Sequence, residues 1–211
     1  EMCDRTAWAI CSSNAWWSVF GKKRAKKGRP GPPAHDDRVQ RDFTATGPNQ
    51  LWLTDITEFQ IPAGKVYLSP IMDLCDRSIV SYSVSTSPNT AFTSQSLRDA
   101  IAQESPDKGL LVHTDQGFQY QHSSWRTLIT GIGGTQSMSR KGNCYDNAVM
   151  ENFFGHLKSE MYHGESFTSL EAFYHAIDDY IRWYNHERIQ KRLKGLTPMQ
   201  YRNQTLKPLT A

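Results

Sequence analysis

Two aspartates stand at places in the sequence where an apolar residue would continue the pattern. Asp55 follows Leu51 and Leu53 on one face of a strand-like run, and Asp115 ends a second such run over 109–115. A single aspartate of this kind is more often a strand-end residue that bonds to the next turn. If the two strands are neighbours, however, their carboxylates repel each other unless a cation lies between them. Magnesium would resolve this repulsion, because it binds carboxylate oxygens and keeps waters for a substrate phosphate.

The stretch RKGNCYDNAVMENFF, residues 140–154, adds two carboxylates near the start of a predicted helix. Asp146 precedes the first helical turn, where a short side chain accepts hydrogen bonds from free backbone N–H groups, and we interpret it as the helix cap. Glu151 lies inside the helix and, taken alone, would be a solvated surface charge. It is not alone, because Asp55 and Asp115 precede it, the latter with 35 residues between.

The elements that must position these residues show two hydrophobic periods. Period-two runs predict strands, and periods near 3.6 predict helices. Short turn-rich links favour an antiparallel meander of three strands, followed by alternating helices and strands. The pattern predicts an α/β domain with a mixed five-stranded sheet flanked by helices. The expected strands are 50–59, 65–74, 78–86, 109–115 and 134–138, and the expected helices are 89–104 with Thr90 as its cap, 123–131, one from about 147, and 169–188.

Composition divides the chain into four parts. Residues 1–20 look like the remnant of an N-terminal helical region that is cut short at Glu1, and 21–48 form a basic linker rich in Gly and Pro. The core is expected over 49–165, with 166–211 as a C-terminal helix and tail that complete it. Three tryptophans are expected in the core: Trp52, Trp125 and Trp183.

Charge and cysteine usage exclude several classes of protein. Lys and Arg outnumber Asp and Glu by only 24 to 21, so local basic runs matter more than the total. No apolar run is long enough to span a bilayer, and no export signal is recognisable. The four cysteines show neither a zinc-site spacing nor a small disulfide scaffold, which favours free thiols in a reducing, cytoplasmic environment.

Basic and polar side chains near the carboxylates are candidates for binding a nucleic-acid backbone. Lys158 lies two helical turns after Glu151 and would reach a phosphate beside the metal site; the alternative is a surface lysine. The loop before the helix offers four candidates, with a solvated loop as the alternative: Arg140, Lys141, Asn143 and Tyr145. The linker offers five, with a solvated linker as the alternative: Lys22, Lys23, Arg24, Lys26 and Lys27. Near the C-terminus, the basic residues that would extend such a surface are Arg182, Arg188, Lys191, Arg192 and Lys194.

Four ordered sequence blocks resemble the second-frame protein of transposases of the insertion-sequence-three family. They are LWLTDITEF, HTDQGFQY, SMSRKGNCYDNAVMENFFGHLKSE and YNHERIQKRLKGLTPMQY, and the resemblance covers about residues 43–203. The N-terminal WWSVFGKKR is similar as well. Within these blocks, Asp55, Asp115 and Glu151 match the D, D-35-E pattern of retroviral-type integrases and of DDE transposases with a ribonuclease H-like fold.

This resemblance implies the catalytic subunit of a transposase with an integrase core. Asp55, Asp115 and Glu151 would be the catalytic residues and the ligands of two Mg²⁺ ions about 4 Å apart, with Mn²⁺ able to substitute and Asp55 bridging both ions. The reaction would cleave and join DNA by direct transesterification, without a covalent enzyme intermediate and through a circular form of the transposon. The implied partners are transposon-end and target DNA, a first-frame helix-turn-helix protein or a fusion to it, and further copies of the chain, on DNA in the cytoplasm of a bacterium.

Two other functions stay open at this point. A ribonuclease H-like nuclease would hydrolyse nucleic acid without joining ends, and a degraded or repurposed element would bind DNA without catalysis. The sequence also departs from its relatives, because its seven histidines do not show the spacing of the zinc module found in retroviral integrases. The resemblance also implies that recognition of the transposon ends needs the first-frame helix-turn-helix partner or a fusion to it, so site-specific activity by this chain alone is not expected.

Overall fold

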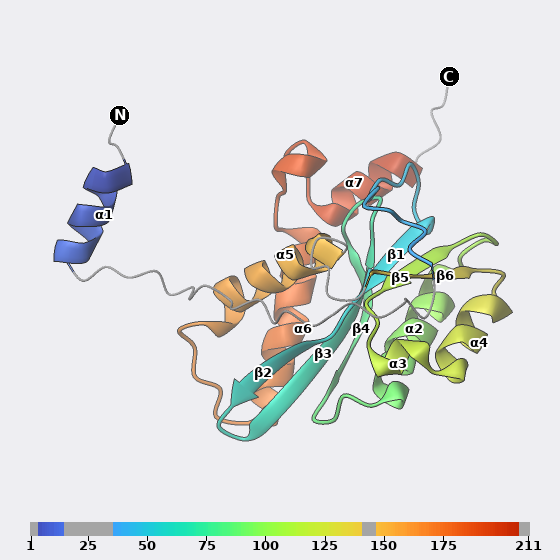
Figure 1. Ribbon diagram of the computed structural model, residues 1–211, viewed down its shortest axis with the longest axis horizontal. Helices are drawn as coiled ribbons and strands as arrows, with labels where there is room; N and C mark the ends of the chain where they lie inside the picture. The colour runs from blue at the N-terminus through green and yellow to red at the C-terminus, as the bar shows by residue number, and fades with distance from the viewer. Residues whose placement is uncertain (1–3, 15–35, 141–146, 207–211) are drawn as a thin grey trace.

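The computed structural model describes residues 4–14, 36–140 and 147–206 (Figure 1). Its strands are β1 (Leu51–Thr54), β2 (Thr57–Ile61), β3 (Gly64–Asp73), β4 (Ile79–Ser85), β5 (Leu111–Thr114) and β6 (Thr135–Met138). Its α-helices are α1 (Asp4–Ser13), α2 (Thr90–Glu104), α3 (Phe118–Gln121), α4 (Ser123–Gly131), α5 (Ala148–Leu157), α6 (Leu170–His186) and α7 (Pro198–Leu206), with the π-helical turn η2 (Lys158–Tyr162) and the 3₁₀ turn η3 (Lys191–Leu193). Within these ranges no helix has the length and apolar character that crossing a membrane requires.

The strands form one mixed sheet. β3 pairs antiparallel with β1, β2 and β4, whereas β5 runs parallel to both β1 and β6. Leu68 of β3 pairs with Thr57 of β2 and with Val84 of β4, so β2 and β4 lie on opposite edges of β3. β1 continues along the edge that β2 occupies, with Leu53 opposite Met72. The predicted α/β fold, a meander followed by parallel strands, is confirmed.

The predicted first strand, 50–59, is two strands in the structure. β1 ends at Thr54 and β2 begins at Thr57, so the sheet has six strands where we predicted five. The break falls at Asp55 and Ile56, where the Asp55 carboxylate accepts a hydrogen bond from the Ile56 N–H (2.7 Å). A side chain that bonds to the backbone in this way competes with the strand ladder. Asp55 therefore comes after the strand end and not within the strand.

Helices cover both faces of the sheet (Figure 1). α2, α3 and α4 pack on one face, and α5 and α6 pack on the other. The alternation of β1 serves both cores, because Leu53 joins the core that contains Phe153 of α5, whereas Trp52 joins the core that contains Trp125 of α4. Since both faces are covered, every residue of β1 is buried.

The α2 cap differs from the prediction. α2 begins at Thr90, but the capping side chain is that of Asn89, which accepts a hydrogen bond from Phe92 N–H (2.9 Å). Asparagine is among the best N-cap residues, because its short side chain reaches the free N–H groups of the first turn. The helix thus starts where predicted, with its cap one residue earlier.

The structure differs from the predictions at one tryptophan and in the predicted linker. Trp52 and Trp125 are fully buried, as predicted, whereas Trp183 is 38% exposed, so the prediction for Trp183 is wrong. Tyr184, the next residue of α6, is buried in its place. Val39 lies in the stretch assigned to the linker, and it is buried against the core that contains α5 and α6.

Arg202 of α7 joins the end of the domain to the sheet through three carboxylates, which we call the arginine cluster. Its guanidinium binds Asp73 (3.0 Å), Asp76 (2.7 Å) and Glu104. Arg202, Asp73 and Asp76 are all buried. Burial and the charge of Asp76 raise the pKa of Asp73, and hydrogen bonds, including that from Arg202, oppose the rise. In this cluster the protein supplies its own cation for buried carboxylates.

Candidate active site

Asp55 and Asp115 follow the ends of two neighbouring parallel strands. β1 and β5 pair with Leu53 opposite His113, and each aspartate comes one residue after its strand. Because the carboxyl ends of parallel neighbours meet at the same edge of a sheet, both side chains reach the same place. They line one open cleft of about 290 Å³, together with Gly117 and residues of β2, β3 and α3.

Two hydrogen bonds orient the Asp55 carboxylate. One comes from the Ile56 N–H, and the other comes from Nδ2 of Asn147 (2.9 Å), the N-cap residue of α5. Burial and then the charge of Asp115 raise the pKa of Asp55 to about 7, and Glu151 adds to the rise while the two hydrogen bonds oppose it. Carboxylates shifted in this way by burial and like charge are typical of functional sites.

Asp115 closes a tight turn at the end of β5. Its Oδ1 accepts a hydrogen bond from the Gly117 N–H (2.8 Å). Burial raises the pKa of Asp115, whereas this hydrogen bond and the nearby His113 lower it. A Cβ atom at position 117 would lie 2.9 Å from Asp115 Oδ1 and 2.9 Å from Gln119 Oε1, closer than real Cβ contacts. A side chain at position 117 would therefore displace the Asp115 carboxylate and the end of Gln119.

Glu151 lies in the first turn of α5, and its side chain is exposed. Its effect on the pKa of Asp55 places its charge near the two aspartates. Across residues 4–14, 36–140 and 147–206, however, no three His, Cys, Asp or Glu side chains are close enough together to hold one metal ion. The structure thus brings Asp55 and Asp115 together and leaves Glu151 beside them with an exposed side chain.

The chemistry of this cleft suits a hard divalent cation. Asp55 and Asp115 offer the carboxylate oxygens that Mg²⁺ and Mn²⁺ prefer. The hydrogen bonds that orient them come from uncharged donors, namely the backbone N–H groups of Ile56 and Gly117 and the amide of Asn147. These donors fix the positions of the oxygens without neutralising them, so the repulsion that raises the pKa of Asp55 is the repulsion that a bound cation would offset.

The candidate DNA contacts that lie within the described part of the chain are Lys158, Arg140 and the C-terminal residues Arg182, Arg188, Lys191, Arg192 and Lys194. Lys158, at the junction of α5 and η2, has its Nζ 5.3 Å from the centre of the Phe59 ring. The pKa of Glu58, which lines the aspartate cleft, is lowered by Lys65 first and to a smaller extent by Lys158. Lys158 is therefore near enough to Glu58 for its charge to act on that lining residue of the cleft, and its contact with DNA stays a prediction.

Arg140 is exposed at the end of β6, and its Nε lies 4.0 Å from Asp37 Oδ2. The N-cap position of α5 falls on Asn147, and its side chain donates to Asp55. The remaining candidates lie outside the described residues: Lys22, Lys23, Arg24, Lys26, Lys27, Lys141, Asn143, Tyr145 and the proposed helix cap Asp146.

Three residues of the cleft were not predicted. Asn147 was passed over in favour of its neighbour Asp146, although a second short polar side chain before a helix was a visible signal. Gly117 follows Asp115 by two positions, and a glycine after a predicted strand indicates only a turn. Tyr120 is buried, with its ring 4.9 Å from that of Trp125, and burial followed by the charges of Asp55 and Asp115 raises its pKa. Its position behind the aspartates depends on how α3 folds back, which no local pattern indicates.

Comparison with known proteins identifies the domain and its relatives. Residues 45–144 and 151–206 each match a family described as an integrase core domain. An uncharacterized transposase-like protein of Haemophilus influenzae is 47% identical over 195 residues, covering 90% of this chain and 90% of that protein. The putative transposase InsK for insertion sequence element IS150 of Escherichia coli is 44% identical, and transposase InsF for insertion sequence IS3A of the same organism is 36% identical. This chain covers 65% of the length of InsK and 62% of that of InsF.

Solved structures show the same fold at low sequence identity. The simian T-cell lymphotropic virus intasome, solved in complex with PP2A regulatory subunit B56 gamma, contains a chain similar to this one with a TM-score of 0.66 and 18% identity, over 99% of this chain and 73% of that one. The HTLV-2 integrase catalytic core domain in complex with magnesium is similar with a TM-score of 0.54 and 18% identity, over 77% and 98% of the two chains. The predicted ribonuclease H-like, integrase-type fold is confirmed.

Proposed function

The chain belongs to the insertion-sequence-three (IS3) family of transposases with an integrase-type core, and we propose that it cleaves and joins DNA with Asp55, Asp115 and Glu151 as its catalytic residues. The observation that carries this proposal is the meeting of Asp55 and Asp115 at the ends of two parallel neighbouring strands. Glu151 supports it, because this residue of the first turn of α5 is near enough for its charge to raise the pKa of Asp55.

The three carboxylates are the proposed ligands of divalent metal ions. We propose that Asp55, Asp115 and Glu151 hold two Mg²⁺ ions, with Mn²⁺ able to substitute, and that Asp55 contributes to both. Bound divalent ions would activate the attacking hydroxyl and stabilise the leaving oxygen of an in-line displacement. Asn147 and the Ile56 N–H orient Asp55, and the Gly117 N–H orients Asp115, so two of the three ligands are positioned before DNA binds.

DNA is the proposed substrate on both sides of the reaction, as transposon end and as target. Lys158 lies near the cleft, and Arg140 stands at the end of β6, where a strand end would pass; we propose that both contact phosphates. We also propose that the chain acts as a homo-oligomer on DNA, with a first-frame helix-turn-helix partner for recognising the ends. The loop and linker residues named above would add sequence-independent contacts.

The test is a joining reaction with matched glutamate variants. Duplexes made from the inverted repeats that flank the coding sequence are labelled and incubated with purified protein, a plasmid target and Mg²⁺ or Mn²⁺. Joined product is expected only with the metal. Glu151→Gln should remove joining while folding and DNA binding stay intact. Glu171→Gln, at an exposed glutamate in the first turn of α6, is the matched control and should keep full activity.

Two outcomes would overturn the proposal in different ways. Full joining by Glu151→Gln would exclude Glu151 from the catalytic set. Metal-dependent cleavage without joined product, when a free 3′-hydroxyl is supplied, would indicate a nuclease that only hydrolyses.

A further inference from the structure

A second pocket, of about 500 Å³, lies between α5 and the segment that links α6 to α7. Four cationic side chains line it, and we call it the basic pocket: Arg77, Arg188, Lys191 and Arg192. None of the described residues that line it is an aspartate or a glutamate. Arg188, Lys191 and Arg192 were predicted to extend a DNA-binding surface, whereas Arg77 was not, and the catalytic site proposed above does not use this pocket.

Arg77 is the most informative residue of the basic pocket. It is only 7% exposed, and its Nε has no hydrogen-bond partner among the residues that the structure describes. Its backbone is in the left-handed region, with φ 65°, in the turn between β3 and β4. Burial and the nearby charge of Arg192 lower the pKa of Arg77 to about 10, which leaves it charged at neutral pH. A buried cationic donor without a partner is costly, so an anion in the pocket that accepts from Nε of Arg77 would satisfy it.

The other side chains of the pocket point to the same kind of ligand. Gln190 also lines the pocket, and its side chain interacts there with the hydroxyl of Tyr184. Lys191 and Arg192 are exposed at its rim. The pocket therefore combines a buried donor, Nε of Arg77, with exposed cations, an arrangement that fits an oxyanion with several acceptor oxygens.

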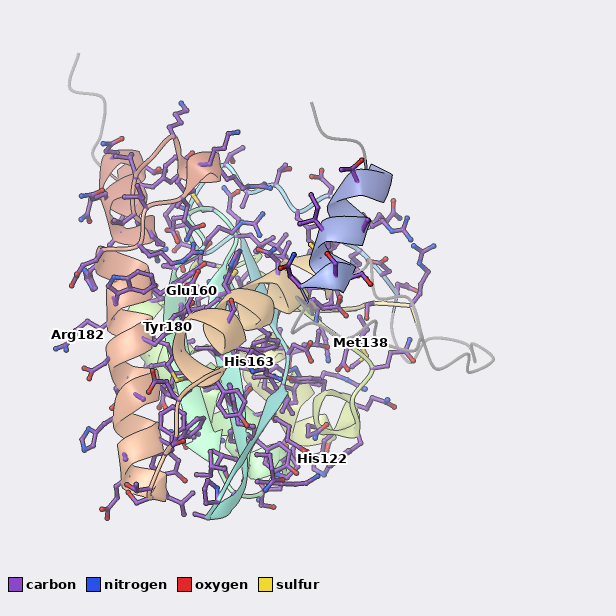
Figure 2. All side chains as sticks on the ribbon, turned by 90° about the vertical axis from the view of Figure 1, so that its left-hand side faces the viewer. His122, Met138, Glu160, His163, Tyr180 and Arg182 are labelled. Atoms are coloured by element: carbon purple, nitrogen blue, oxygen red, sulfur yellow. The ribbon has the colours of Figure 1, made fainter. Side chains whose placement is uncertain are left out.

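Arg188 is held in place by Glu160, which does not line the pocket. Glu160 Oε1 accepts from Arg188 Nη2 (2.6 Å), and its Oε2 accepts from Arg188 Nε (2.9 Å) and from the Tyr180 hydroxyl (2.8 Å). Figure 2 shows Glu160 and Tyr180 close together where η2 meets α6. Glu160 neutralises Arg188 from outside, and it fixes one wall of the pocket while the charges of Arg77, Lys191 and Arg192 stay available to a ligand.

The position of the pocket relative to Glu151 indicates which anion it takes. Glu151 and Asn152 are consecutive on α5, so their side chains point about 100° apart around the helix. Asn152 lines the basic pocket, whereas the charge of Glu151 acts on Asp55 in the aspartate cleft. The pocket and the cleft therefore lie on neighbouring sides of α5, and a helix with its side chains is about 10–12 Å across, so this width bounds the distance between them at the helix.

A DNA strand spans this distance in a few nucleotides. It advances about 3.4 Å per nucleotide, so a strand whose reacting phosphate lies at the cleft would cross α5 within about three nucleotides. We propose that the basic pocket binds a backbone phosphate of the DNA about three nucleotides from the phosphate that reacts. This placement rests on the proposed function, because the distance is counted from the aspartate cleft. The arginine fork of Arg77 suits a phosphodiester, to which it can donate two hydrogen bonds.

Binding of a labelled duplex end to the full chain, measured by fluorescence anisotropy in EDTA over a range of salt, tests the pocket without catalysis. Arg77→Asn is the first variant, because asparagine tolerates the left-handed backbone. We expect about ten-fold weaker binding and a salt slope smaller by about one. The melting temperature should not fall, because the substitution removes a buried unpaired charge.

Arg192→Gln, at an exposed position, should weaken binding in the same way. Arg98→Gln is the matched control and should bind as the wild type does. Arg98 is an exposed residue of α2, which packs on the other face of the sheet.

A second measurement locates the phosphate. Single methylphosphonate groups, which remove one charge, are placed one to six nucleotides from the 3′ end. A loss of affinity at about the third position is expected for the wild type and for Arg98→Gln, and it should vanish in Arg77→Asn and Arg192→Gln. Unchanged affinity and salt slope in both pocket variants would overturn the proposal, as would a lowered melting temperature of Arg77→Asn with an unchanged slope. Absence of joining together with an intact Arg77-dependent phosphate effect would count against the proposed function and not against the pocket.

Discussion

This domain contains two groups of three acidic residues, and only one of the groups has a cationic side chain of the protein among its members. In the arginine cluster, Asp73, Asp76 and Glu104 surround the guanidinium of Arg202, which is itself buried. In the aspartate cleft, Asp55 and Asp115 lie side by side with Glu151 near them, and uncharged donors orient the two aspartates. The same residue type thus appears once with an internal cation and once without.

The difference separates a structural group from a candidate for chemistry. Carboxylates that are paired with an internal guanidinium hold elements together, here α7, α2 and the β3–β4 turn. Carboxylates that repel each other at the end of a sheet destabilise the domain unless something binds there. Burial alone does not distinguish the two groups, because burial raises the pKa of both Asp55 and Asp73. The source of the counter-charge distinguishes them.

The largest effect is expected from removing a carboxylate of the cleft. Asp115→Asn should lower DNA joining by about a thousandfold or more, because a metal site contributes several kcal/mol of transition-state stabilisation. Asp73→Asn, the same substitution in the arginine cluster, should keep joining when it is assayed below its melting temperature. Joining rates of the two variants, with circular dichroism to confirm folding, check this. Equal loss in both would remove the distinction between the clusters.

The next effect is on stability. Arg202→Met leaves Asp73 and Asp76 buried without their cation, which should cost about 3–5 kcal/mol. For a domain of this size, that corresponds to a melting temperature lower by about 10 °C. Thermal unfolding followed by circular dichroism measures it. Arg98→Met, at an exposed arginine of α2, is the control and should change the melting temperature by little. A mild effect at Arg202 would contradict its role as the internal cation.

A smaller effect on activity is expected at Gly117. In Gly117→Ala the new Cβ would press on the Asp115 carboxylate and on Gln119, displacing a ligand of the cleft. We expect about ten-fold slower joining, because small misplacements at a reacting centre are costly. Gly131→Ala, where no atom lies within 4 Å of the new Cβ, should leave the rate unchanged. If the two variants react equally fast, Asp115 tolerates displacement and the turn is not critical.

The smallest effect is a change in melting temperature that has opposite signs in the aspartate cleft and the arginine cluster. In EDTA, Asp55→Asn should raise the melting temperature by a few °C, about 1 kcal/mol, because it removes a buried charge that Asp115 and Glu151 repel. Asp73→Asn should lower it, because it removes a partner of Arg202. Calorimetric scans of both variants measure the shifts. A lowered melting temperature for Asp55→Asn would show that its hydrogen bonds outweigh the repulsion.

The sequence could predict the fold where the pattern is local. Alternation in β1 placed Leu53 and Trp52 on opposite faces, and both are buried in different cores. The break between β1 and β2 could not be predicted, because it depends on a hydrogen bond from Ile56 to a side chain that alternation treats as part of the strand. The exposure of Trp183 depends on which side of α6 packs on the sheet, and that side includes its neighbour Tyr184, which is buried.

The sequence could predict the site residues that stand out in a local pattern. It could not predict contacts between residues that are far apart in the sequence. Asp55 and Asp115 interrupt apolar strands, so their positions were visible in the sequence. Asn147 reaches Asp55 across 92 positions, and Arg202 reaches Asp73 across 129, so no local spacing relates them. Arg77 was unremarkable in the sequence, and only its burial without a partner marks it out.

Calorimetric titration with Mn²⁺ shows whether the aspartate cleft takes its cation from solution while the arginine cluster does not. We expect the wild type and Asp73→Asn to bind Mn²⁺, and Asp55→Asn and Asp115→Asn to lose most of this binding. Equal Mn²⁺ binding by the wild type and Asp115→Asn would contradict this expectation.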